Sequence, residues 1–312
     1  MPSVPDTSDE VLARCREAMT GPVASVHTPF ERDGSVDEGG LRNLVDFVIA
    51  GGAGTVLLTW GDSLFSLLTD DEVVEVTRVV VEQTAGRALT IAACNTWATP
   101  KALQFADWCV EIGADLLMLK PPNWAGSATP ETLVEHYRVV SERIPVMVVT
   151  NVFAGWPHAR AMQVLETLAD AAPGVVAVKD DLCNDFARRL GLVCHQRMAI
   201  ISGGQKQNHL NAHPYGCDGY MSSYILFRPE IPRRYWRAIE EEDLGQAVAI
   251  IRDYDMPLFD FVMALPGGFD AGMHGTLELF GIAGRWRRKP YHSLTDEEMD
   301  RLADFHRGLG LL

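Results

Sequence analysis

The sequence predicts a (β/α)8 TIM barrel with additional C-terminal helices, and two features of its hydrophobic pattern support that fold class. Short β-branched or aliphatic runs recur at start-to-start spacings of roughly 20 to 35 residues, the size of one strand plus one crossover helix. The eight runs are 23–26, 55–58, 89–92, 115–119, 146–149, 175–178, 198–201 and 219–222. Eight strand–helix units in series match a closed barrel of parallel strands. A doubly wound open sheet is the competing architecture, but it would place a glycine-rich turn after its first strand, where Thr28-Pro29-Phe30 stands.

The segments between these runs have the apolar spacing and the end signals of helices. Residues 37–50 place their aliphatic side chains on one helical face, and Gly51-Gly52 ends the segment. Thr69 precedes three acidic residues, which is typical of an N-cap and first turn. Thr99-Pro100 and Thr129-Pro130 each place proline at a first helical position. The pattern therefore predicts crossover helices between the strands.

The last part of the chain looks helical and follows the eighth predicted strand. We assign residues 1–225 to the barrel, preceded by a short N-terminal helix, and residues 226–312 to a helical layer packed on the barrel in the same structural unit. Pro266-Gly267-Gly268 interrupts this layer, and Ser293 or Thr295 opens its last helix. No low-complexity linker separates the two parts.

Composition and charge exclude several classes of partner. The formal net charge of −15 argues against nucleic acid and anionic membrane surfaces. No apolar stretch reaches the roughly 18 residues that a membrane span needs, and residues 1–6 lack the pattern of a signal peptide. The cysteines are scattered without a C-x-x-C pair, which fits reduced thiols and a cytoplasmic location. They are Cys15, Cys94, Cys109, Cys183, Cys194 and Cys217.

Two other groups of residues do not predict a binding site of their own. The basic run Arg285-Trp286-Arg287-Arg288-Lys289 is expected to be a solvated, salt-paired segment between C-terminal helices. His195, His209 and His213 fall on different predicted elements without a carboxylate at chelating spacing. We therefore expect neither a metal nor a cofactor.

Lys179 is the most informative single residue. It ends the buried run 175–178 and is followed at once by Asp180 and Asp181. Burial disfavours an ammonium group, and a neutral amine can attack a carbonyl carbon and form a Schiff base. The alternative is a strand-end lysine that reaches solvent and pairs with Asp180 or Asp181.

Short motifs at successive strand ends resemble the dihydrodipicolinate synthase/N-acetylneuraminate lyase family of Schiff-base barrel enzymes along nearly the whole chain. The first strand ends in Thr28-Pro29-Phe30, as in the family, and Thr59-Trp60-Gly61-Asp62 stands where the family usually has T-T-G-E. Gly113-Ala114-Asp115 before the fourth strand and Pro145 through Asn151 at the fifth also match. At the sixth strand, Val178-Lys179-Asp180 matches the family's I-K-E. Ser202-Gly203-Gly204 matches its S-G-D at the seventh.

The resemblance implies a set of site residues. Lys179 would hold a pyruvate-type 2-oxo acid as an imine, with Thr59 and Thr150 as the other catalytic residues. The carboxylate would sit on the loop of Thr59, Trp60 and Gly61, where backbone N–H groups can bind an anion. Thr59 could instead bond its own loop. The remaining substrate-binding candidates are His27, Asn123, Asn151, Ser202 and Met221; for His27 a structural role is open, and for Met221 ordinary barrel packing.

One feature departs from the family. Members usually carry a tyrosine after the fourth strand that relays protons, but this segment is Pro121-Pro122-Asn123-Trp124. General acid–base catalysis by a placed group contributes roughly 10²–10⁴ in rate. Thr59, Thr150, Asn123 or a water would have to replace the tyrosine, unless Tyr220 or Tyr224 enters the site.

Two functions follow from these observations. The first is a metal-independent lyase, an aldolase or dehydratase, acting on a pyruvate-type 2-oxo acid or a 2-keto-3-deoxy sugar acid. The alternative, motivated by the missing tyrosine, is a catalytically silent member that binds a 2-oxo acid as a sensor or scaffold. The resemblance also implies a homo-oligomer, a dimer or a tetramer. No nucleic acid or membrane partner is expected.

Overall fold

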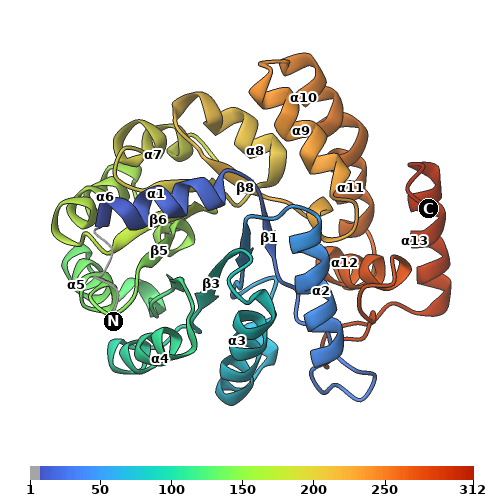
Figure 1. The fold of residues 1–312 in the computed structure, drawn as a ribbon, viewed down its shortest axis with the longest axis horizontal. Coiled ribbons are helices and arrows are strands. Elements are labelled where there is room, and N and C mark those ends of the chain that lie inside the picture. The colour runs from blue at the N-terminus through green and yellow to red at the C-terminus, as the bar shows by residue number, and fades with distance from the viewer. Residues whose placement is uncertain (1–7) are drawn as a thin grey trace.

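Eight parallel strands form a closed barrel in sequence order in the computed structural model, which describes residues 8–312 (Figure 1). Residues 1–6, where the sequence lacks a signal-peptide pattern, lie outside the described residues. The strands are β1 (Gly21–Ser25), β2 (Thr55–Leu57), β3 (Leu89–Ala93), β4 (Leu116–Leu119), β5 (Val146–Val149), β6 (Val175–Asp180), β7 (Ala199–Ser202) and β8 (Gly219–Met221). The predicted fold class is confirmed, and each predicted run contains or overlaps one strand.

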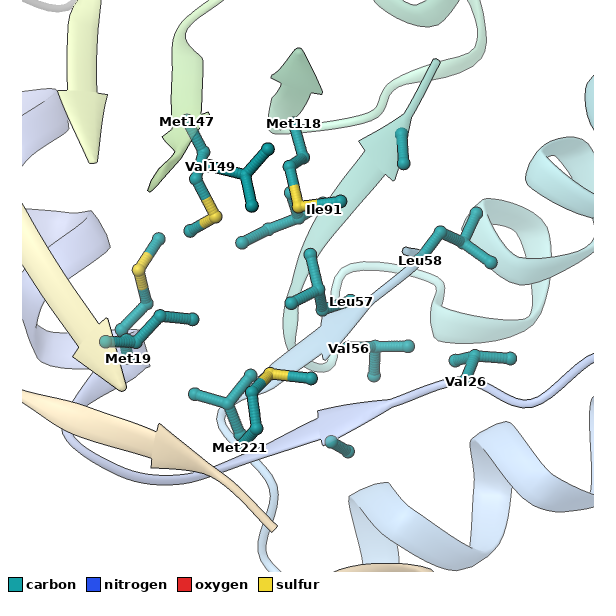
Figure 2. Packing of buried hydrophobic residues seen from close by; sticks show 14 of the residues in the cluster. Met19, Val26, Val56, Leu57, Leu58, Ile91, Met118, Met147, Val149 and Met221 are labelled. Atoms are coloured by element: carbon teal, nitrogen blue, oxygen red, sulfur yellow. The ribbon is translucent and has the colours of Figure 1, made fainter. Parts of the chain in front are cut away.

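The barrel interior is a packed core. Met118 of β4 and Met147 of β5 direct their sulfur atoms inward, while Met221 of β8 lies across from them (Figure 2). Met19, at the end of the helix that precedes β1, is fully buried beside them. Unbranched methionines fill irregular gaps, which suits the tapering space inside eight tilted strands. The reactive end of such a barrel is the face where the strands reach their carboxyl ends.

Helices cover the outside of the barrel, and their ends follow the sequence signals. They are α1 (Ser8–Met19), α2 (Glu38–Ala50), α3 (Asp70–Thr84), α4 (Thr99–Ile112), α5 (Pro130–Ser141), α6 (His158–Ala171), α7 (Phe186–Cys194) and α8 (Gln205–Ala212). Asp37 caps α2 by accepting a hydrogen bond from the Gly40 amide at 2.8 Å. Thr69 and Glu72 form a capping box at α3, and Thr129 caps α5. α4 begins at Thr99 with Pro100 in its first turn, in line with the predicted start; the N-cap residue Ala98 makes no side-chain cap bond, and the Thr99 hydroxyl bonds His136.

The chain after β8 forms α9 (Glu230–Glu240), α10 (Leu244–Ile250), a π-helix η6 (Ile251–Asp255), α11 (Met256–Met263), α12 (Gly268–Leu279) and α13 (Asp296–Gly308). Figure 1 shows these helices in orange and red along one side of the molecule. Trp236 of α9 packs over Gly21 of β1. None of the described helices is long and apolar enough to cross a membrane. Thr295 caps α13, as one of the two predicted starts.

Candidate active site

A cavity of about 450 Å³ opens at the carboxyl ends of the barrel strands. Its size is in the range of small-molecule sites. Of the residues predicted for the site, the structure brings seven into its lining: His27, Thr59, Trp60, Gly61, Asn151, Lys179 and Met221. These residues come from five loops and strand ends that are far apart in the sequence but meet at one face of the barrel.

Lys179 lies in the last part of β6 and is 8% exposed. Its register opposite Val149 of β5 and Ile201 of β7 fixes the backbone on both sides. The Lys179 ammonium pairs with the carboxylate of Asp181, which also lines the cavity. The sequence posed burial and pairing as alternatives, but the structure has both: the amine is paired and faces the cavity rather than bulk solvent.

Thr150 lies outside the cavity lining and takes part in the turn that follows β6. Its hydroxyl donates to Asp180 Oδ1 at 2.9 Å and accepts from the amides of Asp181 and Leu182 at 2.9 and 3.2 Å. Burial raises the pKa of the Asp180 carboxyl, and the Thr150 hydrogen bond opposes that shift. Thr150 therefore orients the segment that carries Lys179 and Asp181.

The loop after β2 is held by hydroxyl groups. The Thr59 hydroxyl accepts a hydrogen bond from the Asp62 amide at 2.9 Å, the local bond that the sequence left open as an alternative. The Thr59 amide donates to Ser63 Oγ at 2.9 Å, and Ser63 Oγ donates to the Val26 carbonyl at 2.6 Å. These bonds fix the Thr59, Trp60 and Gly61 backbone at the cavity edge, where amide N–H groups can bind an anion.

Two of the three polar strand-end residues predicted for the site have structural partners. Asn123 accepts a hydrogen bond from the Ala128 amide at 3.1 Å, and Ser202 accepts one from the Gly204 amide at 3.3 Å. Neither lines the cavity, so direct substrate contact by Asn123 or Ser202 is not supported. Asn151 does line the cavity, and its buried side-chain oxygen has no hydrogen-bond partner among the described residues.

No tyrosine is among the residues that line the cavity in the described chain. The Tyr220 hydroxyl donates to the Pro232 carbonyl at 3.2 Å, and the Tyr224 hydroxyl donates to the Tyr254 carbonyl at 3.0 Å. Both phenols are buried against the C-terminal helices. The suggestion that Tyr220 or Tyr224 replaces the family tyrosine is therefore wrong for this arrangement.

His27 lines the cavity and belongs to a buried polar cluster behind it. His27, Asp270 and His274 place ligand atoms within 4.8 Å of one another, a spacing that could hold a metal ion. The Arg287 guanidinium, however, already pairs with the Asp270 carboxylate. A divalent cation would add uncompensated charge to a buried site, which costs much free energy. We therefore interpret the cluster as an ion pair flanked by two imidazoles.

The ion pair between Arg287 and Asp270 corrects one part of the expectation for the basic run 285–289. Arg285 and Arg288 are salt-paired, as expected, but Arg287 is buried rather than solvated. Burial lowers the pKa of its guanidinium to about 10.

The C-terminal helices also reach the cavity. Phe259 of α11 and Phe269 of α12 stack with ring centroids 5.4 Å apart and form part of the cavity wall.

Sequence reasoning missed Lys120, Asp181, Phe259 and Phe269 as cavity residues. Lys120 directly follows β4, so the rule that singled out Lys179 would also have found it. The two phenylalanines gave no such signal, because only the tertiary packing of α11 and α12 brings them to the barrel mouth.

The closed parallel barrel carries a buried lysine in a cavity at the carboxyl ends of its strands. A model of the Dihydrodipicolinate synthetase family matches residues 18–307, and the chain belongs to this family. The family resemblance inferred from the strand-end motifs is confirmed.

Two of the sequence relatives carry different names. A protein from Streptomyces coelicolor named probable 5-dehydro-4-deoxyglucarate dehydratase 2 is 28% identical over 267 residues, covering 82% of this chain and 80% of that protein. The 4-hydroxy-tetrahydrodipicolinate synthase of Methylococcus capsulatus is 29% identical over 236 residues, covering 74% and 79%. Both names describe lyases, so the chain is a member of a lyase family.

Solved structures support the fold. The structure of dihydrodipicolinate synthase from Oceanobacillus iheyensis matches with a TM-score of 0.81 and 20% identity, covering 96% of this chain and all of that one (100%). N-acetylneuraminate lyase from Mycoplasma synoviae matches with a TM-score of 0.79 and 20% identity, covering 94% and 98%.

Proposed function

We propose that the protein is a Schiff-base lyase that captures a hydroxylated 2-oxo acid, such as a 2-keto-3-deoxy sugar acid, on Lys179. The observation that carries the proposal is the Lys179 amine, 8% exposed, in a cavity shared with the loop after β2. The carboxylate of the 2-oxo acid would bind the backbone N–H groups of Trp60 and Gly61. The adjacent keto carbon would then lie within reach of the amine.

The proposed chemistry proceeds through an imine between Lys179 and the substrate. The amine adds to the keto carbon, and loss of water from the carbinolamine gives an iminium ion. The iminium withdraws electrons, so a proton leaves the neighbouring carbon and an enamine forms. In a dehydratase the enamine then expels a hydroxyl from the next carbon, which leaves with a proton as water and gives a conjugated iminium ion. In an aldolase no prior enamine is needed, because the hydroxyl on the next carbon loses its proton, the carbon–carbon bond breaks towards the iminium, and an aldehyde and the enamine result. Water finally hydrolyses the imine and restores the amine.

Dehydration is the branch that we favour. Several relatives are named 5-dehydro-4-deoxyglucarate dehydratase, and the cavity carries amides and hydroxyls suited to a substrate with several hydroxyl groups. Asn151, Gln205, Gln207, Asn208 and Ser222 are those side chains. The buried Ser222 hydroxyl and Asn151 oxygen have no hydrogen-bond partner in the described part of the chain.

Reductive trapping tests the proposal directly. The protein is incubated with borohydride and a panel of 2-oxo acids, from pyruvate to 2-keto-3-deoxy sugar acids, and digested for mass spectrometry. We expect an adduct on Lys179 that disappears in Lys179→Ala. Lys101→Ala, at an exposed lysine paired with Asp70, is the control and should keep the adduct. Labelling of another lysine, or of none, would contradict the proposal.

The same panel separates a lyase from a silent binding protein. A lyase releases a dehydrated or cleaved product, seen by NMR of the mixture. A sensor would be stabilised thermally by the 2-oxo acid without product. If an adduct forms on Lys179 but no 2-oxo acid of the panel is converted to product, the result favours the sensor.

A further inference from the structure

Lys120 is a second amine in the same cavity as Lys179. It directly follows β4, is half-buried, and lines the cavity together with Lys179 and Asp181. Two lysines at one barrel mouth are not needed for Schiff-base formation, because a single amine forms the imine. The second lysine therefore requires its own explanation.

An aromatic contact orients the Lys120 side chain. Its Nζ lies 3.9 Å from the centroid of the Trp60 ring, a short cation–π distance. The Trp60 indole nitrogen in turn donates a hydrogen bond to Asn95 Oδ1 at 3.1 Å, which fixes the ring. The ammonium is thus held beside the loop where the substrate carboxylate is proposed to bind.

Burial of the side chain favours proton release from Lys120. Burial lowers the pKa of its ammonium below the usual lysine range, the nearby Asp181 carboxylate opposes that shift, and the positive charge of Lys179 adds to it. An acid–base group works best when its pKa lies near the working pH. Lys120 is closer to that condition than a solvent-exposed lysine.

The cavity also lacks other groups suited to this task. No tyrosine lines it among the described residues, and the Thr59 hydroxyl already accepts a hydrogen bond from the Asp62 amide. Asp181 is paired with Lys179, and burial lowers the pKa of His27, which favours its neutral form. Among the described residues that line the cavity, Lys120 is the remaining cationic proton donor.

We propose that Lys120 is a catalytic acid–base residue that moves protons at the imine formed on Lys179. The Lys120 ammonium protonates the carbinolamine hydroxyl, the carbon–oxygen bond breaks, and water leaves the iminium ion behind. The neutral Lys120 amine then takes the proton from the carbon next to the iminium, giving the enamine and regenerating the ammonium. This role rests on the proposed function, because it requires the imine on Lys179.

Pyruvate serves as the probe, because an imine with pyruvate exchanges methyl protons with solvent. The wild-type protein in D2O should exchange these protons, as followed by NMR. Lys120→Met should slow the exchange by about 10²–10⁴-fold, the usual contribution of a placed acid–base group. Lys120→Arg keeps the positive charge but cannot release a proton near neutral pH, so it should slow the exchange comparably.

Two further measurements separate proton transfer from a structural effect. Adding methylamine to Lys120→Ala should restore part of the exchange, in proportion to the free ammonium and amine. Lys101→Met is the matched control, because Lys101 also lies over a tryptophan, Trp97, at 4.6 Å, but outside the cavity. Its exchange rate should equal that of the wild type.

The outcomes distinguish the two proposals. If pyruvate is not trapped on Lys179 in the wild type and no exchange occurs, the proposed function fails for pyruvate, and the acid–base role fails with it. If Lys179 is trapped normally but Lys120→Arg exchanges like the wild type, the imine stands and the acid–base role of Lys120 is overturned. Absence of any rescue by methylamine, with folding intact by circular dichroism, would also contradict it.

Discussion

At the scale of single residues, the site depends on side chains at strand ends and on one glycine that lets the barrel close. Gly219 begins β8 and pairs in register with Gly21 of β1 and Ile201 of β7. A Cβ at this position would lie 2.0 Å from the Met19 carbonyl oxygen and 2.5 Å from that of Gly21. Both are backbone atoms, which cannot withdraw without opening the junction between the first and last strands.

We therefore expect Gly219→Ala to lower the free energy of unfolding by about 3 kcal/mol or more, as severe overpacking does. Gly308→Ala is the control, because nothing lies within 4 Å of the Cβ that it adds near the end of α13. That substitution should leave stability unchanged or raise it by about 0.5–1 kcal/mol. Thermal unfolding followed by circular dichroism compares the two. Equal melting temperatures would mean that the strand junction is more pliable than its geometry indicates.

At the scale of elements, Arg288 connects the C-terminal segment to the start of α3. Its guanidinium donates to both carboxylate oxygens of Glu72, at 2.7 and 2.8 Å, and to the carbonyls of Gly34 and Leu67, at 2.8 and 2.7 Å. The Arg288 hydrogen bonds are the largest cause that lowers the pKa of Glu72 to about 2. The same carboxylate completes the capping box of α3 with Thr69.

Arg288→Met should lower the free energy of unfolding at neutral pH by about 2 kcal/mol, since charge-assisted bonds to a partly buried carboxylate are lost. Arg78→Met removes an arginine that pairs with Glu75 and Glu82 on the surface of α3 itself, and it should change stability little. Urea unfolding of both variants provides the comparison. A loss as large in Arg78→Met as in Arg288→Met would mean that α3 is stabilised by its own surface pairs rather than by the C-terminal segment.

At the scale of the whole molecule, buried histidines link stability to pH. Desolvation lowers the pKa of His136 and His306 to about 4 and that of His209 and His274 to about 3. These folded values lie below the value of about 6.5 in the unfolded chain. Between the folded and the unfolded pKa values, the unfolded state binds more protons than the folded state. The stability that is present above pH 6.5 is therefore lost as the pH falls towards 4.

We expect urea unfolding to show a steep loss of stability from pH 7 to pH 5, about 1 kcal/mol per histidine and pH unit below 6.5. His136→Asn should reduce that slope by the contribution of one histidine, about 1 kcal/mol per pH unit. Thr99→Val removes the 2.8 Å bond between the Thr99 hydroxyl and His136 Nδ1 but keeps the imidazole, so it should lower stability without changing the slope. A slope that is the same in His136→Asn and the wild type would contradict this assignment.

The local signals in the chain predicted the barrel and much of its reactive face. Eight runs of buried strand, each followed by a helix, specify which segments form strands, because the period of the apolar residues differs between strand and helix. Their parallel order in turn brings all the carboxyl ends to one face. Strand-end position and the family resemblance together therefore predicted Lys179, Thr59 and Asn151 at one site, and all three line the cavity.

What the sequence alone could not settle was where each strand-end side chain points and what fills the rest of the cavity. Thr150 and Ser202 also follow or end strands, yet their hydroxyls bond the neighbouring backbone rather than face the cavity. Phe259 and Phe269 come from helices beyond the barrel and reach its mouth only because α11 and α12 pack there. The period of the apolar residues indicates which residues are buried. The direction of a side chain at a strand end depends instead on contacts between segments that are distant in the chain, and only the tertiary structure supplies those contacts.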